Sequence, residues 1–243
     1  MSARVLLITG ANGSLGQAIA EAFLAEAPTN FLWLGVHTRR DRADELFQRH
    51  PDQAACVSLD VTQPAAWQAA VGQIIARHQR LDVLVNNAGF HEDSLLATMP
   101  AASWQRVLDA NLHAVFHGCQ AVLPPMISQR HGRIINLSSL SALLAPAGQA
   151  NYAAAKAGVL ALTQSLAKEV ARIGITVNAL CPGYIESEAL ASLPEAERTA
   201  ARLRVPMRRF GTPAEVAAAV RFLACSEAGY ITGSALKIDG GIF

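Results

Sequence analysis

Charge is scarce in this sequence and nearly balanced. Only 16% of its 243 residues are Asp, Glu, Lys or Arg, and the formal net charge is +1. No basic tail or block stands out, so neither nucleic acid nor an anionic membrane is an expected partner. No apolar run approaches the roughly 20 residues that a membrane-spanning helix needs. Met1 to Ile8 lead directly into a strand-like stretch and leave no room for a cleavable signal, which predicts a cytoplasmic protein.

Cysteine is equally sparse, with four residues spread along the chain and none in a Cys-x-x-Cys pair. Each lies in or beside an apolar stretch. This placement is typical of buried, reduced thiols and argues against disulfides and against a metal site. The four residues are Cys56, Cys119, Cys181 and Cys225.

Hydrophobic residues, in contrast, make up 51% of the chain, enough for a large buried core. Continuously apolar runs alternate with stretches of helical length, as in a sheet that helices cover on both faces. No linker or repeat divides the chain. We therefore predict one α/β domain over residues 1–243, a Rossmann-type doubly wound parallel sheet flanked by helices. The seven predicted strands are Arg4–Thr9, Phe31–Val36, Ala54–Asp60, Leu81–Asn86, Arg133–Ser138, Ile175–Cys181 and Ala235–Asp239.

A glycine-rich turn, Thr9–Gly16, joins the first strand to a helix expected at Gln17–Ala27. Glycines permit tight turning and close approach to a phosphate, and a helix N-terminus offers free N–H groups. In this position the turn is typical of a dinucleotide-binding loop. An ordinary glycine turn is the alternative.

No acid stands at the tip of the second strand, which is followed by residues 37–41, His-Thr-Arg-Arg-Asp. A carboxylate there would bind the ribose 2′-hydroxyl of NAD, whereas arginines accommodate the 2′-phosphate of NADP. Arg39 and Arg40 therefore favour NADP, unless they are only the solvated start of the next helix. Asp41 is expected as the N-cap or a first-turn acid of that helix.

The third and fourth strands also end in polar residues, at the edge of the sheet where ligands bind. Asp60, followed by Val61, is a candidate for the adenine amino group. Asn86 and Asn87 offer amides that bridge strands or the cofactor, and Ala88-Gly89 keeps side chains away from a flat ligand. The alternative is that the Asn-Asn-Ala-Gly turn has a purely structural role.

Tyr152 and Lys156 stand four residues apart in Gly148–Gly158, an alanine-rich stretch that predicts a helix with both side chains on one face. A free phenol has a pKa of about 10, and a nearby ammonium should lower it. The pair would supply a general acid for an oxygen on which negative charge develops. A packed tyrosine and a solvated lysine are the structural alternative.

Together with Asn111, Ser139 and Pro182-Gly183, these motifs resemble the short-chain dehydrogenase/reductase family in their order and over essentially the full length. The resemblance implies that Tyr152 protonates the substrate carbonyl oxygen as hydride arrives and that Ser139 hydrogen-bonds the same oxygen. Its neighbour Ser138 is a confusable alternative, but the family spacing selects Ser139. Lys156 would hold the nicotinamide ribose hydroxyls and lower the pKa of Tyr152.

The resemblance also assigns a role to Asn111, in a helix predicted at Ala101–Gln129. It would interrupt regular helix bonding and anchor a water in a proton relay through Lys156. The alternative is a buried asparagine that needs a partner but has no catalytic role.

The nicotinamide would lie against residues 182–187, Pro-Gly-Tyr-Ile-Glu-Ser. The backbone at Ile185 would meet its carboxamide, and Ser187 would contact the same group or the pyrophosphate. Glu188–Val205 resembles the mobile substrate lid or is otherwise a plain surface helix. The resemblance and the loops together imply a cofactor site of Gly10, Asn12, Gly13, Ser14, Leu15, Gly16, His37, Thr38, Arg39, Arg40, Asp60, Val61, Asn87, Ala88, Gly89, Tyr152, Lys156, Pro182, Gly183, Ile185 and Ser187.

Within the family, Gly148–Lys156, Arg130–Ile135 and Gly174–Asn178 most resemble the beta-ketoacyl-acyl-carrier-protein reductases, which reduce a beta-keto thioester with NADPH. The likeness implies an acyl carrier protein as partner. Arg130 and Arg172 are docking candidates for its acidic surface, unless they are solvated arginines at helix ends.

Three departures from that pattern leave the acyl chain open. Ser14 stands where a glycine is usual and an extra glycine precedes it; Ser14 is expected to cap the helix. Residues 90–93, Phe-His-Glu-Asp, replace a usual Thr and basic residue before the Asp. The second docking position falls on Ile173, beside Arg172.

The predicted helices at residues 101–129 and 151–172 are apolar on nearly every side, which suggests a symmetric subunit interface. The family resemblance implies a homotetramer with the C-terminus near a subunit contact. Two other functions stay open: reduction of a free small ketone, sugar or steroid, and a non-catalytic NADP-sensing or structural subunit. Family members that lose catalysis commonly lose the Tyr or Lys, and both are present here.

Overall fold

The computed structural model describes residues 4–243, in which seven parallel strands form one sheet in the order β3-β2-β1-β4-β5-β6-β7. The chain builds the sheet outward from β1 in one direction and then from β4 in the other, so the direction of winding switches between β1 and β4. All seven predicted strands are confirmed, with ends that shift by two residues at most. The strands are β1 Val5–Thr9, β2 Phe31–Val36, β3 Ala54–Ser58, β4 Val83–Asn86, β5 Gly132–Leu137, β6 Ile175–Pro182 and β7 Ala235–Ile238.

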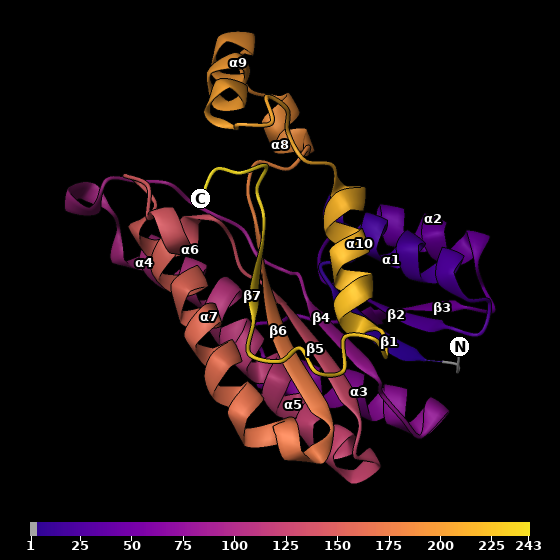
Figure 1. Ribbon diagram of the computed structural model, residues 1–243. Helices are drawn as coiled ribbons and strands as arrows, with labels where there is room; N and C mark the ends of the chain where they lie inside the picture. The colour runs from indigo at the N-terminus through magenta and orange to yellow at the C-terminus, as the bar shows by residue number, and fades with distance from the viewer. Residues whose placement is uncertain (1–3) are drawn as a thin grey trace.

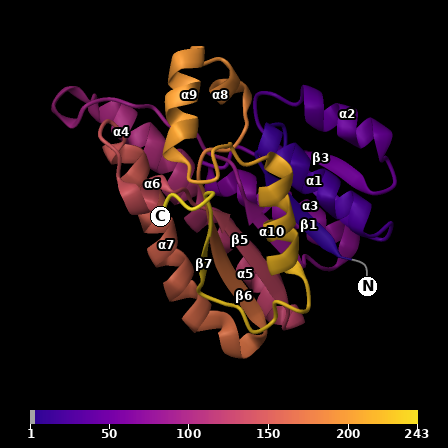
Figure 2. The same ribbon diagram turned by 45° about the horizontal axis from the view of Figure 1, so that its top comes forward.

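Helices cover both faces of this sheet (Figures 1 and 2). One apolar core joins the sheet to α1, α2 and α10, and a second joins its other face to α3, α5 and α7. Strands buried on both sides need apolar residues at every position, which explains the continuous runs in the sequence. The helices are α1 Ser14–Glu26, α2 Asp41–Arg49, α3 Pro64–His78, α4 Ala101–Leu108, α5 Ala114–Gln129, α6 Ser141–Leu144, α7 Ala150–Val170, α8 Glu188–Ala191, α9 Glu195–Arg204 and α10 Pro213–Ala224, with short 3-10 turns η1 Leu96–Thr98 and η3 Ala171–Ile173 and a π-helical turn η2 Asp109–His113.

Two helix predictions need correction. The first helix begins at Ser14 rather than at Gln17, and Ser14 does not cap it: Gly13 is the N-cap residue and makes no side-chain cap bond. The helix predicted at Ala101–Gln129 is divided into α4 and α5 by the π-helical turn that contains Asn111. The expected interruption at Asn111 is thus present.

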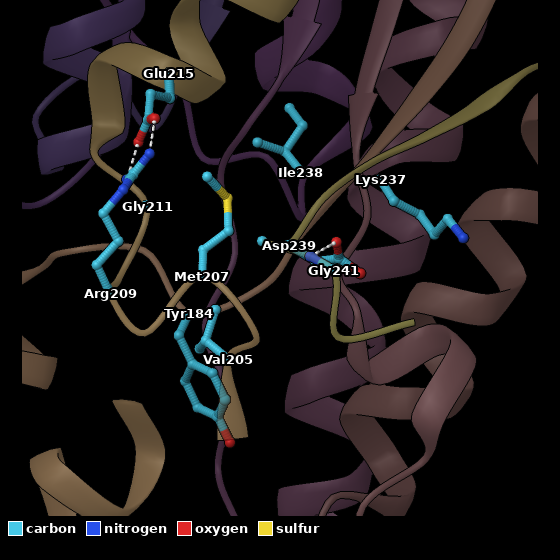
Figure 3. A pocket seen from close by; sticks show the side chains of 11 residues that line it. Tyr184, Val205, Met207, Arg209, Gly211, Glu215, Lys237, Ile238, Asp239 and Gly241 are labelled. Atoms are coloured by element: carbon cyan, nitrogen blue, oxygen red, sulfur yellow. Dashed lines mark hydrogen bonds and ion pairs between the residues drawn. The ribbon is translucent and has the colours of Figure 1, made fainter. Parts of the chain in front are cut away.

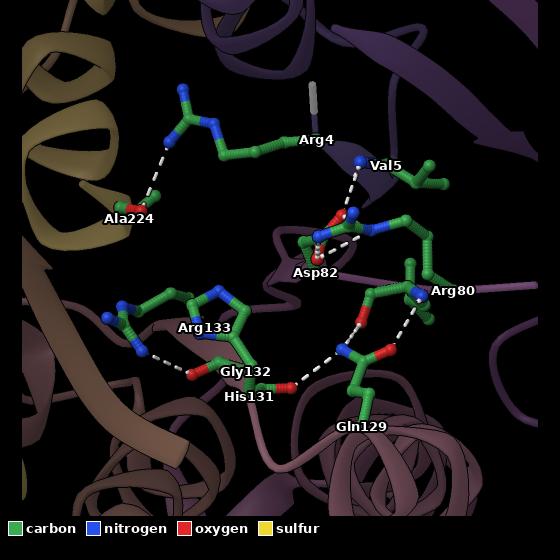
Figure 4. A network of polar contacts seen from close by, with 10 residues as sticks. Arg4, Val5, Arg80, Asp82, Gln129, His131, Gly132, Arg133 and Ala224 are labelled. Atoms are coloured by element: carbon green, nitrogen blue, oxygen red, sulfur yellow. Dashed lines mark hydrogen bonds and ion pairs between the residues drawn. The ribbon is translucent and has the colours of Figure 1, made fainter. Parts of the chain in front are cut away.

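Polar contacts tie together the chain at the amino ends of the strands (Figure 4). The buried carboxylate of Asp82 accepts hydrogen bonds from the backbone N–H of Val5 at 2.7 Å and from Arg80 at 2.6 Å. Arg4 donates to the carbonyl of Ala224 at 3.1 Å, where it satisfies the C-terminus of α10. Gln129 links the chain before β4 to the chain before β5.

The carboxyl ends of the strands are therefore the open edge. Helices α8 and α9 follow β6 and stand over this edge, separate from the helices that cover the two faces of the sheet (Figure 1). Within residues 4–243 no helix combines the length and the apolarity needed to cross a bilayer. All four cysteines are free; Cys119 and Cys181 are buried as expected, whereas Cys56 and Cys225 are partly exposed.

Candidate active site

The glycine-rich turn forms a tight cradle at the N-terminus of α1. Gly10 has a positive φ of 63°, a conformation that favours glycine. A Cβ atom on Gly16 would lie 2.4 Å from the carbonyl oxygen of Gly10, so Gly16 must stay a glycine, whereas one on Gly13 would meet only that oxygen, at 3.5 Å. The first-turn N–H groups of α1 have no intrahelical partners and are suited to a phosphate.

Two polar side chains hold this cradle against β4. The hydroxyl of Thr9 accepts from the N–H groups of Asn87 and Ala88 at 2.9 and 3.0 Å. The amide of Asn87 in turn donates to the carbonyls of Thr9 and Gly10 at 2.9 and 3.2 Å. Asn87 therefore holds the glycine-rich loop through contacts within the protein. From the sequence, its amide could bridge either two strands or a strand and the cofactor.

The two arginines after β2 are not equivalent. Arg40 forms a two-point ion pair with Asp44, at 2.8 and 2.9 Å, one helical turn away. Arg39 remains 70% exposed and has only a long contact, 3.9 Å, with Asp41. Of the two predicted phosphate-binding arginines, Arg39 is therefore the less tightly paired.

Asp41 is the first residue of α2, as a first-turn acid, and is not free to bind a ribose. Its carboxylate accepts from the amide of Asn12 at 2.9 Å, and this hydrogen bond lowers the pKa of Asp41. The same Asn12 accepts from the N–H of Ala43 at 3.1 Å. Asn12 therefore fastens the glycine loop to α2.

Asp60 lies after β3, beside the exposed side chain of His37; Thr38, the next residue after β2, is exposed as well. Burial opposes its ionisation, but hydrogen bonds from the N–H and hydroxyl of Thr62 lower the pKa of Asp60 overall. Its second oxygen lies 3.8 Å from the His37 ring. A carboxylate ionised at neutral pH is available there for an amino group. Val61 follows it and accepts from the Trp67 ring through its carbonyl.

Ser139 and Tyr152 line one cavity of 420 Å³ at the carboxyl end of β5 and the start of α7. Ser138 is turned away, because its buried hydroxyl donates to the carbonyl of Lys156 at 2.8 Å. The geometry thus separates the two serines as the family spacing does. Burial raises the pKa of the Tyr152 phenol, whereas its contact with the Ser139 hydroxyl lowers it.

Lys156 lies on the same side of α7 but does not contact the phenol oxygen through a hydrogen bond. Its ammonium donates to the carbonyl of Leu137 at 2.8 Å and lies 5.6 Å from the centre of the Tyr152 ring. The side chain is buried, and burial lowers the pKa of Lys156 to about 8. The expected depression of the Tyr152 pKa by this ammonium is not found: the pKa of Tyr152 is raised, because burial outweighs the other influences.

Asn111 occupies the π-helical turn between α4 and α5. Its amide nitrogen donates to the carbonyls of Phe90 and Val107 at 2.7 and 2.9 Å, while its amide oxygen is buried without a partner among the described residues. A Cβ atom on Gly89 would lie 2.4 Å from that oxygen and 3.5 Å from the Lys156 ammonium. The orphaned oxygen therefore points into the space beside Lys156, where it can accept from a water.

A chain of polar contacts on the substrate side was not predicted. His91 and Gln149 both contact the carboxylate of Asp93, at 2.9 Å each. Gln149 accepts from the hydroxyl of Ser141 at 2.8 Å, and the N–H of Ser141 donates to the hydroxyl of Ser139 at 3.1 Å. The presence of His and Asp in the unusual segment 90–93 was the only sequence signal for it.

The His91 ring also stands edge-on to the Tyr152 ring, with centroids 5.8 Å apart. One end of the polar chain therefore contacts Tyr152 directly, and its other end reaches Ser139. The side chains of Ser139 and Tyr152 are thus both held by this chain of polar contacts.

The loop after β6 separates this cavity from a second one. Gly183 and Pro182 line the Tyr152 cavity, and Tyr184 borders both. A parallel bridge between Ile185 and Gly211 fixes the loop. Ser187 caps α8, accepting from the N–H of Leu190 at 3.2 Å, so its hydroxyl is already engaged in the loop's own structure.

The second cavity, of 480 Å³, contains charged groups that are already paired (Figure 3). Arg209 binds Glu215 at 2.6 Å, and Asp239 accepts from the N–H of Gly241 at 3.0 Å. Lys237 points away from the Arg209 pair and donates to the carbonyl of Phe243. The candidate catalytic residues Ser139 and Tyr152 line the smaller of these two cavities.

Arg130 and Arg172 lie far from that cavity. Arg130 ends α5 and Arg172 lies just after α7, both exposed, next to the amino ends of β5 and β6. Tyr152 is at the opposite end of α7, about 30 Å away along a helix of this length. A Cβ atom on Gly174, two residues after Arg172, would lie 2.8 Å from the carbonyl oxygen of Arg130, so the loops that carry the two arginines are adjacent.

Comparison with known proteins agrees with this geometry. Residues 10–242 match the family described as "Enoyl-(Acyl carrier protein) reductase". The chain is 42% identical over 243 residues to 3-oxoacyl-(acyl-carrier-protein) reductase FabG of Vibrio cholerae, covering 100% of this chain and 98% of that protein. It is 39% identical over 240 residues to the protein of the same name from Escherichia coli, covering 99% and 97%. It is also 37% identical over 243 residues to Nodulation protein G of a Rhizobium species, covering 100% and 98%. The chain therefore belongs to the short-chain dehydrogenase/reductase family.

Proposed function

We propose that the protein reduces a beta-ketoacyl thioester to the beta-hydroxyacyl thioester with NADPH, in fatty-acid or related acyl-chain biosynthesis. The observation that carries the proposal is the placement of Ser139 and Tyr152 on one cavity, with the buried ammonium of Lys156 beside the Tyr152 ring. Relatives named as 3-oxoacyl-(acyl-carrier-protein) reductases support the choice of substrate class.

The cofactor fits the residues that are present. The cradle at Gly16 has no room for a Cβ atom, the start of α1 offers N–H groups, and the exposed guanidinium of Arg39 has only a long contact with Asp41. A diphosphate would lie at the start of α1, and a 2′-phosphate would lie at Arg39. When bound, NADPH supplies the hydride that converts the ketone carbon to an alcohol carbon.

The protein's own residues then manage the proton. The Ser139 hydroxyl would donate to the ketone oxygen and orient it, and Tyr152 would give its phenolic proton to the same oxygen. Lys156 would bind the nicotinamide ribose and stabilise the phenolate, whether or not it keeps its hydrogen bond to the carbonyl of Leu137. The unpartnered oxygen of Asn111 would hold a water through which Tyr152 regains its proton.

We further propose that residues 1–243 form one cytoplasmic NADP-binding domain that assembles as a homotetramer. Apolar side chains exposed on α5 and in the loop beside α7, Phe116, Leu95 and Leu96, support one subunit interface. The exposed Leu236 on the edge strand β7 and Phe243 at the chain end support a second.

An acyl carrier protein is the proposed substrate carrier. If it binds the exposed surface of Arg130 and Arg172, it must deliver its substrate to a neighbouring subunit, since both lie at the far end of the strands from Tyr152. In this arrangement, delivery of the substrate from the carrier depends on the tetramer.

Spectrophotometric oxidation of NADPH tests the proposal, with NADH in parallel, against acetoacetyl and crotonyl thioesters on carrier and coenzyme A and against free ketones. We expect turnover of the acetoacetyl thioesters with NADPH. Inertness toward them with good turnover of free ketones would support a small-ketone reductase, and turnover of crotonyl thioesters alone would support a double-bond reductase. Absence of all turnover would favour a sensing or structural subunit.

A further inference from the structure

The cavity of Ser139 and Tyr152 contains a cationic side chain that the proposed reaction does not use. Arg204 lines this cavity and is the last residue of α9. Helix α9 stands over the open edge of the sheet (Figure 2), and the Arg204 side chain is exposed, so the guanidinium lies at the solvent side of the cavity. Much of the remaining wall is apolar, formed by Leu140, Leu144, Pro146, Ala147 and Ile242.

The other arginines of this region already have partners. Arg198 and Arg202 both pair with Glu195, at 3.2 and 3.0 Å, and Arg209 pairs with Glu215. Arg208 donates to the carbonyl of Leu203. Arg204 makes no hydrogen bond or ion pair with any residue in the described range 4–243.

Among the described residues, the cavity also has no unpaired carboxylate that could bind this cation. Asp93 is the only acid in the wall among the described residues, and it is held by His91 and Gln149 at 2.9 Å each. A guanidinium at the mouth of a largely apolar cavity, without a counter-charge, attracts an oxyanion and binds it through charge-assisted hydrogen bonds.

We propose that Arg204 is a specificity-determining residue that binds an oxyanion carried by the substrate, away from the reacting carbonyl. The proposal rests on the proposed reduction of a thioester. The favoured oxyanion is a phosphate on the pantetheine arm, because the arm enters from solvent, where Arg204 lies, while the acyl chain faces the apolar wall. A carboxylate at the far end of the acyl chain has the same chemistry and is the second source.

Arg204 also occupies the last turn of α9, where a cation stabilises the helix dipole whatever the substrate. Arg202 shares this turn but pairs with Glu195 and does not line the cavity. Arg202→Ala is therefore the matched control. It removes one arginine from the same turn and leaves the proposed oxyanion contact in place.

The test compares kcat/KM for acetoacetyl-pantetheine, acetoacetyl-4′-phosphopantetheine and a 3-oxo-pantetheine thioester with a terminal carboxylate. For Arg204→Ala we expect the preference for the phosphorylated over the uncharged thioester to fall about tenfold or more, the loss expected for one hydrogen bond to a charged group. The preference of Arg204→Lys should lie between those of the wild type and Arg204→Ala. This variant serves as the second test if alanine destabilises α9. Arg202→Ala should keep the wild-type preference.

An unchanged preference in Arg204→Ala toward both charged substrates would overturn the proposal, as would an equal fall in Arg202→Ala. A fall confined to the carboxylate substrate would support it and identify the acyl end as the source of the oxyanion. Wild-type protein that reduces free ketones but none of the three thioesters would overturn the proposed function itself, before any variant is compared.

Discussion

The ammonium of Lys156 lies 5.6 Å from the centre of the Tyr152 ring and donates to the carbonyl of Leu137 at 2.8 Å. The contact is with the ring rather than with the phenol oxygen, and Lys156 has no carboxylate partner among residues 4–243. Burial lowers the pKa of Lys156 to about 8 and raises that of Tyr152. In this state the phenol keeps its proton at neutral pH and is ready to donate it, while the lysine carries a charge that burial makes costly.

The cost of the Lys156 charge should appear as a pH-dependent stability. The pKa is about 8 in the folded protein, below its ordinary value of 10.5, so the unfolded chain binds more protons between these values and stability rises with pH there. Below pH 8 both states are protonated and the full penalty, up to about 3 kcal/mol, is present. In Lys156→Met this rise should be absent. Urea unfolding of both proteins between pH 7 and 9.5 measures it.

The exposed Lys168 on the same helix provides the control for that experiment. Lys168→Met should keep the wild-type rise in stability with pH. If Lys156→Met showed the same rise as the wild type, the buried ammonium would not be its source.

Tyr152→Phe should lower the rate of ketone reduction by about 10² to 10⁴, the range for loss of a general acid. The change removes the phenolic proton and leaves the ring and its contacts with His91 and Lys156 in place. NADPH binding, measured by fluorescence, should be nearly unchanged. The exposed Tyr230 supplies the control, since Tyr230→Phe removes a hydroxyl that does not line the Tyr152 cavity. Reduction at the wild-type rate by Tyr152→Phe would assign the proton to another donor.

Cofactor choice should depend on Arg39 far more than on Arg40. Arg39, after β2, has only a 3.9 Å contact with Asp41, whereas Arg40 is bound to Asp44 through two hydrogen bonds. Loss of a charge-assisted phosphate contact costs about 1.5 to 3 kcal/mol, roughly ten- to a hundredfold in affinity. Arg39→Ala should therefore weaken NADPH by this factor and NADH much less, while Arg40→Ala should weaken neither strongly. Titration by fluorescence measures all four constants, and equal loss of NADPH and NADH in Arg39→Ala would contradict a 2′-phosphate contact.

The strands and the position of the candidate site at one edge of the sheet were predictable because each depends on a local pattern. Continuous apolar runs mark strands buried on both faces, and residues that follow such strands meet at one edge of the sheet. The inequality of Arg39 and Arg40 was also within reach, because Asp44 stands four residues after Arg40 on the same helix.

The remaining features depend on contacts between distant segments. Gln149 reaches Asp93 across 56 positions of the chain, and no local period marks such a pair. The raised pKa of Tyr152 follows from burial in the folded protein, which the spacing to Lys156 alone does not reveal. Ser14 was expected to cap α1 because serine is a common cap, but the extended backbone of Gly13 takes that position instead.

The two later glycines of the cofactor loop should respond in opposite ways to the same change. Gly13 has an ordinary φ of −76°, and a Cβ atom there would meet only the Gly10 carbonyl oxygen, at 3.5 Å, so Gly13→Ala should fold and bind NADPH nearly as the wild type does. A Cβ atom on Gly16 would lie 2.4 Å from the same oxygen and 2.8 Å from the Cα of Ala11.

Alanine at position 16 gains about 0.5 to 1 kcal/mol in helix propensity, but the clash is with backbone atoms that cannot turn aside, and overpacking of this kind costs about 1 to 3 kcal/mol. Gly16→Ala should therefore lower the melting temperature, and because the loop must open, NADPH affinity should fall together with it. Thermal unfolding with and without NADPH separates the two effects: the shift that the cofactor produces should be nearly lost in Gly16→Ala and kept in Gly13→Ala. If both variants kept that shift, the cofactor phosphates would not lie in the cradle between Gly10 and the start of α1.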